Sequence, residues 1–210
     1  MDPQLTEEQQ YEQLKSIVKE YGVPVLLGAV IGLGGLIGWR TFSSHQLETQ
    51  GKASEQYAQL IDELVKETPD VQGKADQLIQ SHPDSTYAVL AEFHAAKALV
   101  DKKEYAKAKE KLIKAFETAD SPEIKSIANV RLVKILIALE KYDEALKQLK
   151  QPHPKSFNAQ FEELKGDIFV AKGELTKARD AYQKALDEDG AKSSPALQLK
   201  FDDLAVIAKQ

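Results

Sequence analysis

The chain has 210 residues, of which 28 are Lys or Arg and 33 are Asp or Glu, and its net charge is −5. No block of basic residues stands out, so the composition argues against nucleic acid as a partner. Because the chain has no cysteine, disulfides, a lipid-modified N-terminal cysteine and cysteine-ligated metal are excluded. The length leaves room for about one domain beyond an apolar segment near the N-terminus.

Residues 1–20 form the first predicted segment, which is more acidic than basic. Its residues Tyr11, Leu14 and Val18 fall on one face of a helix together with Tyr21, the first residue of the next segment, a pattern typical of an amphipathic helix. The acidic balance weakens attraction to anionic lipid headgroups. We therefore expect this face to contact a partner protein, and the alternative is that it lies along the lipid headgroups.

Residues 21–40 form the second segment, YGVPVLLGAVIGLGGLIGWR, which carries no charge before Arg40. A bilayer core requires about 20 mostly apolar residues in a helix, so the segment predicts a transmembrane helix. The alternatives are a cleaved signal peptide and a buried core helix. The basic start and small-residue cleavage site of a signal peptide are missing, and no polar face marks the run as a core helix.

Glycine is frequent in this segment, and the spacing of Gly28 with Gly32 and of Gly34 with Gly38 is that of small residues four apart. Such spacing allows two membrane helices to approach closely, so these four glycines are candidate helix-packing positions. The alternative is that glycine is simply common in membrane helices. Pro24 is expected in the first turn of the helix, where its missing amide hydrogen costs little.

Residues 41–210 read as helical throughout, and an internal repeat of about 35 residues is visible there. The repeated segments are EYAKAKEKLIKAF from Glu104, KYDEALKQLKQPH from Lys141 and ELTKARDAYQKAL from Glu174. In each segment an alanine is followed, four residues later, by a larger apolar residue. The three pairs are Ala108 and Leu112, Ala145 and Leu149, and Ala178 and Tyr182. The pattern predicts antiparallel helix pairs with small side chains at the crossings.

The last copy, with Gly166 expected at the crossing with Ala178, closely resembles the tetratricopeptide repeat. The middle copy departs from it, because Val133 takes the small-residue position and Pro152 and Pro154 shorten the second helix. The predicted fold class is therefore all-α: a tetratricopeptide-like helical repeat solenoid with one N-terminal transmembrane helix.

Repeat solenoids need atypical units at their ends. Residues 46–81 are a candidate degenerate helix pair, with Tyr57, Leu60, Ile61 and Leu64 expected on one face. Residues 197–208 are a candidate C-terminal cap, and the residues at its helical spacing are Leu197, Phe201, Leu204 and Ala208.

The chain also resembles, nearly end to end, the ancillary subunit of the bacterial SecYEG translocon, the YfgM type. The resemblance is carried by TEEQQYEQLKSIVKEYG near the N-terminus, the glycine-rich span ending in GWR, HPDSTYAVLA (His82–Ala91), GDIFVAKGELTKARDAYQKAL (Gly166–Leu186) and LKFDDLA (Leu199–Ala205). It implies a single-pass protein of the bacterial inner membrane, with residues 1–20 in the cytoplasm and residues 41–210 in the periplasm. Basic residues flank the span evenly, so charge alone leaves this orientation open.

The resemblance further implies association with the SecYEG translocon and with a membrane-anchored periplasmic chaperone of the PpiD type. The role implied is assistance to the biogenesis of secreted or envelope proteins, with unfolded secreted clients as further candidate partners. A regulator of the envelope stress response, which sequesters a signalling protein, is the alternative, because both roles need only a binding groove.

Nothing in the sequence indicates catalysis, so we expect no enzyme, no cofactor and no metal site. The four histidines are not paired at ligand spacing: they are His45, His82, His94 and His153. Asp84 or Ser85 is expected to cap the helix that begins near Thr86.

The predicted binding surface is the concave face lined by the first helix of each pair. Aligning the three copies places these residues on it: Leu90, Phe93, Lys97, Val100, Ile127, Val130, Lys134, Ile137, Gln160, Glu163, Asp167 and Val170. Apolar members would contact nonpolar segments, and the lysines and acids would set register. The alternative is that the degenerate first helices cover the apolar members.

Overall fold

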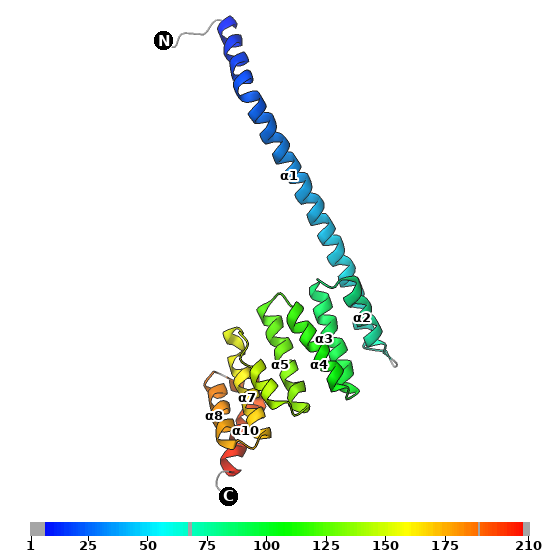
Figure 1. The fold of residues 1–210 in the computed structure, drawn as a ribbon, viewed down its shortest axis with the longest axis vertical. Helices are drawn as coiled ribbons and strands as arrows, with labels where there is room; N and C mark the ends of the chain where they lie inside the picture. Colours follow the sequence, from blue (N-terminus) through cyan, green and yellow to red (C-terminus); the bar gives the residue numbers. More distant parts are fainter. Residues whose placement is uncertain (1–6, 67–68, 189, 208–210) are drawn as a thin grey trace. The chain divides into compact units, whose positions relative to one another are not determined.

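The computed structural model describes residues 7–66, 69–188 and 190–207, and within these ranges the protein is all helical with no strand (Figure 1). The chain divides into two units, Met1–Gly51 and Lys52–Gln210. The helices are α1 (Glu7–Glu63), α2 (Val71–Ser81), α3 (Thr86–Asp101), α4 (Tyr105–Thr118), α5 (Pro122–Ala138), α6 (Tyr142–Gln148), the 3-10 helix η1 (Lys155–Phe157), α7 (Asn158–Ala171), α8 (Leu175–Asp187), α9 (Gly190–Ser193) and α10 (Pro195–Ile207).

The first unit is formed by α1, which runs without a break past residues 20 and 40. Pro24 therefore lies inside the helix, and its predicted first-turn position is wrong. The residues before Tyr21 are themselves helix-forming, so no new helix begins at the apolar segment. Proline has no amide hydrogen, so the carbonyl of Glu20, four residues earlier, lacks its usual helical partner.

The apolar side chains of this unit are exposed. Leu26, Ile31 and Trp39 are each more than half exposed, as are most of the other large apolar side chains of residues 21–40. A stretch of α1 is long and apolar enough to cross a membrane, judged by length and composition. An exposed apolar surface of this extent requires an apolar environment or a protein partner.

The second unit contains three helix pairs, α3 with α4, α5 with α6 and α7 with α8, which follow one another in Figure 1. The turns within the pairs share one conformation, because Lys103, Glu140 and Gly173 have φ values of 62°, 57° and 75°. The amide after each of them donates to the carbonyl five residues earlier at 2.8 Å in all three turns, as in a Schellman motif. The predicted repeat is thus confirmed.

Small residues lie where the helices of each pair cross. Ala108, Ala145 and Ala178 have no exposed surface. In the third pair a Cβ added to Gly166 would lie 2.2 Å from ring carbons of Tyr182. The three predicted alanines are therefore buried, and at Gly166 only a residue without a Cβ fits against the Tyr182 ring.

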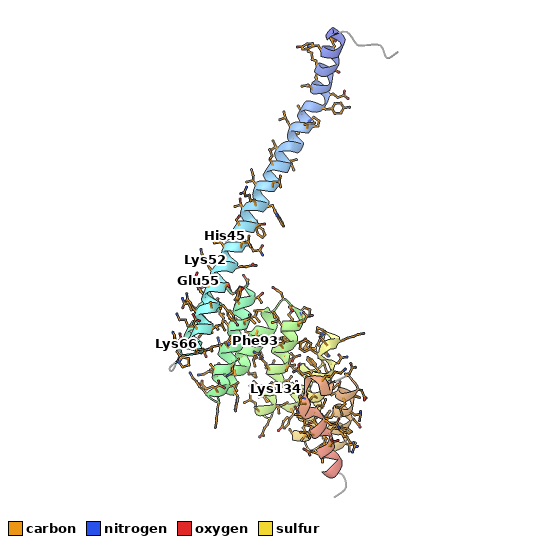
Figure 2. The ribbon with its side chains drawn as sticks, turned by 180° about the vertical axis from the view of Figure 1, so that it is seen from behind. His45, Lys52, Glu55, Lys66, Phe93 and Lys134 are labelled. Carbon is orange, nitrogen blue, oxygen red and sulfur yellow. The ribbon has the colours of Figure 1, made fainter. Side chains whose placement is uncertain are left out.

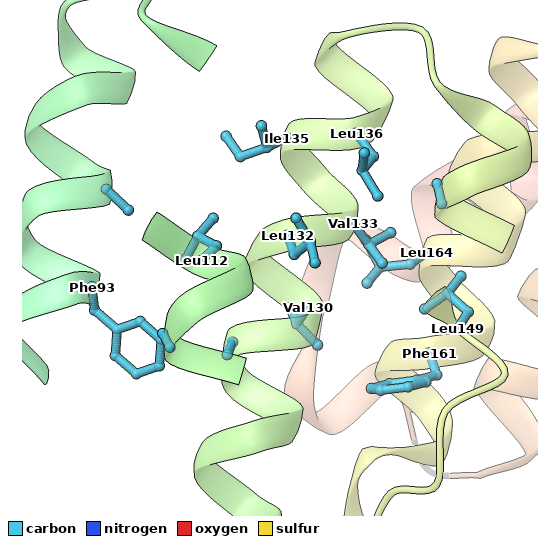
Figure 3. Packing of buried hydrophobic residues seen from close by; sticks show 14 of the residues in the cluster. Phe93, Leu112, Val130, Leu132, Val133, Ile135, Leu136, Leu149, Phe161 and Leu164 are labelled. Carbon is cyan, nitrogen blue, oxygen red and sulfur yellow. The ribbon is translucent and has the colours of Figure 1, made fainter. Parts of the chain in front are cut away.

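A continuous core extends from α3 to α7 and includes Phe93 of α3, Leu112 of α4, Val133 of α5 and Phe161 of α7 (Figure 3). The short α6 ends before the prolines that follow it. The buried amide of Asn129 donates to the carbonyl of Gln148 at 3.0 Å, which satisfies a carbonyl at the C-terminal end of α6.

The N-terminal end of the stack is the predicted degenerate pair, formed by the last turns of α1 and by α2. Ala53 and Leu60 are fully buried in a separate cluster with residues of α2 and α3. Ile61 and Leu64 are 37% and 41% exposed, so the predicted face is buried at Leu60 and open at these two residues. Leu64 follows the last residue of α1.

The C-terminal end is the predicted cap, α10, which packs against α8. Leu197 and Leu204 are buried, and Phe201 is partly buried. Ala208, the fourth predicted member of this face, lies outside the described residues.

Candidate protein-binding groove

A hollow of about 530 Å³ lies between α3 and α5 of the second unit. Most of its lining is apolar, and its polar groups come from α3, α5 and the last turns of α1. The residues that line it are Tyr57, Leu90, Phe93, His94, Ala96, Lys97, Val100, Leu112, Arg131, Lys134 and Ile135.

A second hollow of about 310 Å³ lies between α5, α7 and α10 and is more polar. The residues that line it are Lys134, Ser156, Phe157, Gln160, Glu163, Leu164, Asp167, Ser194 and Lys200. Lys134 lines both hollows, so they adjoin at this residue and extend over helices of all three repeats (Phe93 and Lys134 are labelled in Figure 2). We call the two hollows together the groove.

Eight of the twelve predicted binding residues line the groove. Those in the first hollow are Leu90, Phe93, Lys97, Val100 and Lys134, and those in the second are Lys134, Gln160, Glu163 and Asp167. The four that line neither hollow are Ile127, Val130, Ile137 and Val170. Whether any of the twelve binds a partner stays a prediction.

On α5 the repeat alignment and the structure agree at Lys134 and differ at the neighbouring positions. Repeat alignment selected Val130, but that side chain is 5% exposed and belongs to the core. The next residue, Arg131, lines the groove together with Ile135. One residue turns a helix by about 100°, which is enough to exchange a groove position for a core position.

The charges in the first hollow come from Lys97, Arg131 and Lys134. The Arg131 guanidinium lies over the Phe93 ring, 4.4 Å from its centroid, a cation–π arrangement that also covers the ring. Lys97 pairs with the exposed Asp101 at 2.9 Å. Tyr57 Oη lies 3.1 Å from Nε2 of His94.

The surroundings of His94 favour its neutral form. Burial, together with the nearby cations Arg131 and Lys97, lowers the pKa of His94 below its ordinary value of 6.5. Burial also raises the pKa of Tyr57, so its phenol stays protonated. The Tyr57–His94 contact is therefore a neutral polar feature in the first hollow.

The second hollow contains an internal ion cluster. Lys200 Nζ lies 2.8 Å from Glu163 and 2.7 Å from Asp167. The Tyr182 hydroxyl donates to Asp167 at 2.8 Å, and the Ser194 hydroxyl donates to Glu163 at 3.0 Å. Although burial opposes it, the hydrogen bonds to Asp167 and Glu163 raise the pKa of Lys200 above its ordinary value.

The groove residues that sequence reasoning missed include Tyr57, His94, Arg131, Ile135 and Lys200. For Lys200 a signal existed, because it follows the buried Leu197 by three residues and so shares the inner face of the cap. A lysine at such a position calls for an acidic partner.

The described residues contain no group of three or more His, Asp or Glu side chains arranged to hold a metal ion. The Ser85 hydroxyl accepts from the amide of Ala88 at 3.1 Å. This confirms the predicted cap of the helix that begins at Thr86 and assigns it to Ser85. The arrangement as a whole offers recognition of a polypeptide surface through apolar contact and charge.

Comparison with known proteins agrees with this architecture. Residues 15–206 match the family described as tetratricopeptide repeat-like domain. The chain is 31% identical to the ancillary SecYEG translocon subunit of Haemophilus influenzae, over 95% of this chain and 98% of that protein. The chain belongs to the family of ancillary SecYEG translocon subunits. Relatives of the same name in Aggregatibacter actinomycetemcomitans and Escherichia coli K12 are 30% and 29% identical, each over 95% of this chain and over 98% and 97% of their own lengths. The fold class and the family predicted from the sequence are confirmed.

In this member of the ancillary translocon subunit family, the glycines of α1 are unobstructed. A Cβ added at Gly28, Gly32, Gly34 or Gly38 would meet no atom within 4 Å. Nothing within the first unit therefore requires glycine at these positions for packing. Their predicted role, close approach of a second membrane helix, stays a prediction.

Proposed function

We propose that this protein is a single-pass subunit of the bacterial inner membrane that associates with the SecYEG translocon. In this proposal residues 1–20 lie in the cytoplasm, residues 21–40 span the membrane and residues 41–210 lie in the periplasm. Support comes from the exposed apolar side chains of α1 and from the names of the relatives. The glycine face with Gly28 and Gly32 is the proposed contact with a translocon helix.

The proposed role of the second unit is to bind a partner protein without catalysis. One observation carries this proposal: the two hollows adjoin at Lys134 and form a groove across three repeats. Tetratricopeptide-like stacks offer such grooves as extended binding surfaces. The proposed partner is a membrane-anchored periplasmic chaperone of the PpiD type, and the proposed outcome is assistance to secreted or envelope proteins leaving the translocon.

Site-specific photocrosslinking in living cells tests both contacts. A photoreactive residue at Lys134 is expected to crosslink to the chaperone, and one at Gly32 to a SecYEG subunit. Lys150, which is exposed and lines neither hollow, is the matched control for Lys134. If the Lys134 probe captures mainly a signalling protein and the Gly32 probe captures no translocon subunit, the stress-response alternative replaces the proposal.

Protease added to intact spheroplasts tests the orientation. The expected result is loss of the second unit while a cytoplasmic marker survives. Digestion that occurs only after the membrane is ruptured would place the second unit in the cytoplasm and overturn the proposed topology.

A further inference from the structure

We propose that the groove selects an acidic amphipathic segment of a partner protein, because Lys200 holds both of the groove's own carboxylates in internal contacts while Arg131 and Lys134 remain available. This inference rests on the proposed function of the second unit as a binding module. It adds the chemistry of the partner segment: large apolar side chains on one face, with Asp or Glu beside them.

The carboxylates of the second hollow are occupied by contacts within the protein. Glu163 and Asp167 both bond to Lys200, and their side chains are only 14% and 27% exposed. Each also accepts a hydrogen bond from a hydroxyl, Ser194 for Glu163 and Tyr182 for Asp167. Charge-assisted hydrogen bonds of this kind are strong, so these two acids are poorly available to a basic ligand.

The cations of the first hollow lack such compensation. Among the described residues, neither Arg131 nor Lys134 has a carboxylate within ion-pair distance. The two lie three residues apart on α5, and therefore on neighbouring positions of one helix face. Lys97 does pair with Asp101, but both side chains are more than 60% exposed, and such an exposed pair is readily exchanged for another carboxylate.

The floor between these cations is apolar, with Leu90, Val100, Leu112 and Ile135 among its residues. An occupant must supply apolar side chains to this floor and negative charge to α5. The chain itself carries a net charge of −5, so the cationic rim is a local feature that favours acidic ligands and disfavours basic ones. The continuation of the groove to α7 and α10 favours an extended polypeptide segment over a small anionic amphiphile, which would need only the first hollow.

The test uses the full chain in nanodiscs of zwitterionic lipid and fluorescein-labelled peptides, with empty nanodiscs as the background. One peptide has leucines at helical i, i+3, i+4 and i+7 spacing and glutamates at the flanking positions. A second replaces every glutamate with lysine, a third replaces every glutamate with serine, and an acyl chain with a carboxylate head represents the small amphiphile. Fluorescence anisotropy is expected to show the tightest binding for the glutamate peptide.

Two variants locate the effect. Lys134→Glu is expected to weaken binding of the glutamate peptide about five- to tenfold, and Lys150→Glu, with the same charge change outside the groove, is expected to leave it unchanged. Lys200→Met uncovers the two carboxylates and is expected to weaken the same peptide. Adding Glu163→Gln and Asp167→Asn to Lys200→Met removes those charges and is expected to restore binding. Circular dichroism confirms that each variant is folded.

The inference is overturned if the lysine or serine peptide binds as tightly as the glutamate peptide. It is also overturned if Lys134→Glu and Lys150→Glu weaken binding of the glutamate peptide equally. A third contradictory result is complete displacement of the bound glutamate peptide by the acyl carboxylate. Crosslinking at Lys134 distinguishes failure of the acidic-segment inference from failure of the proposed binding function. A Lys134 probe that still captures the chaperone keeps the binding role and rejects only the acidic chemistry.

Discussion

Gly166→Ala is the smallest change that tests the packing of the third repeat. Its added Cβ would lie 2.2 Å from Cδ1 and Cε1 of Tyr182, whereas nonbonded carbons settle at about 3.5–4.0 Å. The Tyr182 ring is 3% exposed, and its hydroxyl is bonded to Asp167. The ring therefore has little freedom to move away, and the helix pair must separate.

The expected loss of stability follows from two opposing effects. Overpacking of a well-packed site costs up to about 3 kcal/mol, while alanine improves helix propensity over glycine by about 1 kcal/mol. The net loss is about 2 kcal/mol, which corresponds to a melting temperature about 4–8 °C lower for a domain of this size. Thermal unfolding of the full chain followed by circular dichroism measures it.

Gly51→Ala is the matched control, because a Cβ there meets no atom within 4 Å. We expect it to leave the melting temperature unchanged or slightly higher. Tyr182→Leu removes the opposing ring, so Gly166→Ala should cost less in that background, with a coupling energy of about 1 kcal/mol or more. Equal melting temperatures for Gly166→Ala and Gly51→Ala, or a cycle with no coupling, would refute the assignment of this crossing.

Three further changes test other parts of the second unit. Glu140→Gly relieves a non-glycine residue at φ 57° and should raise stability by up to about 1 kcal/mol, so a lower melting temperature would contradict the strained-turn interpretation. Asn129→Ala leaves the Gln148 carbonyl without its donor and should cost about 1–3 kcal/mol, as measured by urea unfolding. Burial raises the pKa of Glu92 above its ordinary value of 4.5, an effect that Lys111 partly offsets at 3.4 Å. Because the folded state then holds this proton more tightly, the contribution of Glu92 to stability falls as the pH rises through the raised pKa. Glu92→Gln should remove this fall, and an unchanged pH profile of unfolding would exclude Glu92 as its source.

The sequence by itself determined the helix pairs and their crossings. Spacing between small and large residues predicted Ala108, Ala145 and Ala178 as packing positions within the helix pairs, and all three are buried. Such information is local, because a helix has a fixed period and a position on it can be read from residues three and four away. The apolar run of residues 21–40 was readable for the same reason, whereas Pro24 showed that adjoining helical segments can merge into one.

Only the tertiary structure decided the character of the groove. Lys200 lies 37 and 33 residues from Glu163 and Asp167 in the sequence, and no local period connects positions so far apart. The repeat alignment also chose Val130, although packing of α5 turns Arg131 into the groove over Phe93. Which neighbour of Lys134 faces the groove, and which distant lysine meets Glu163 and Asp167, depend on how side chains fill the space between elements. Together these contacts place the available cations in the first hollow and engage the carboxylates of the second within the protein.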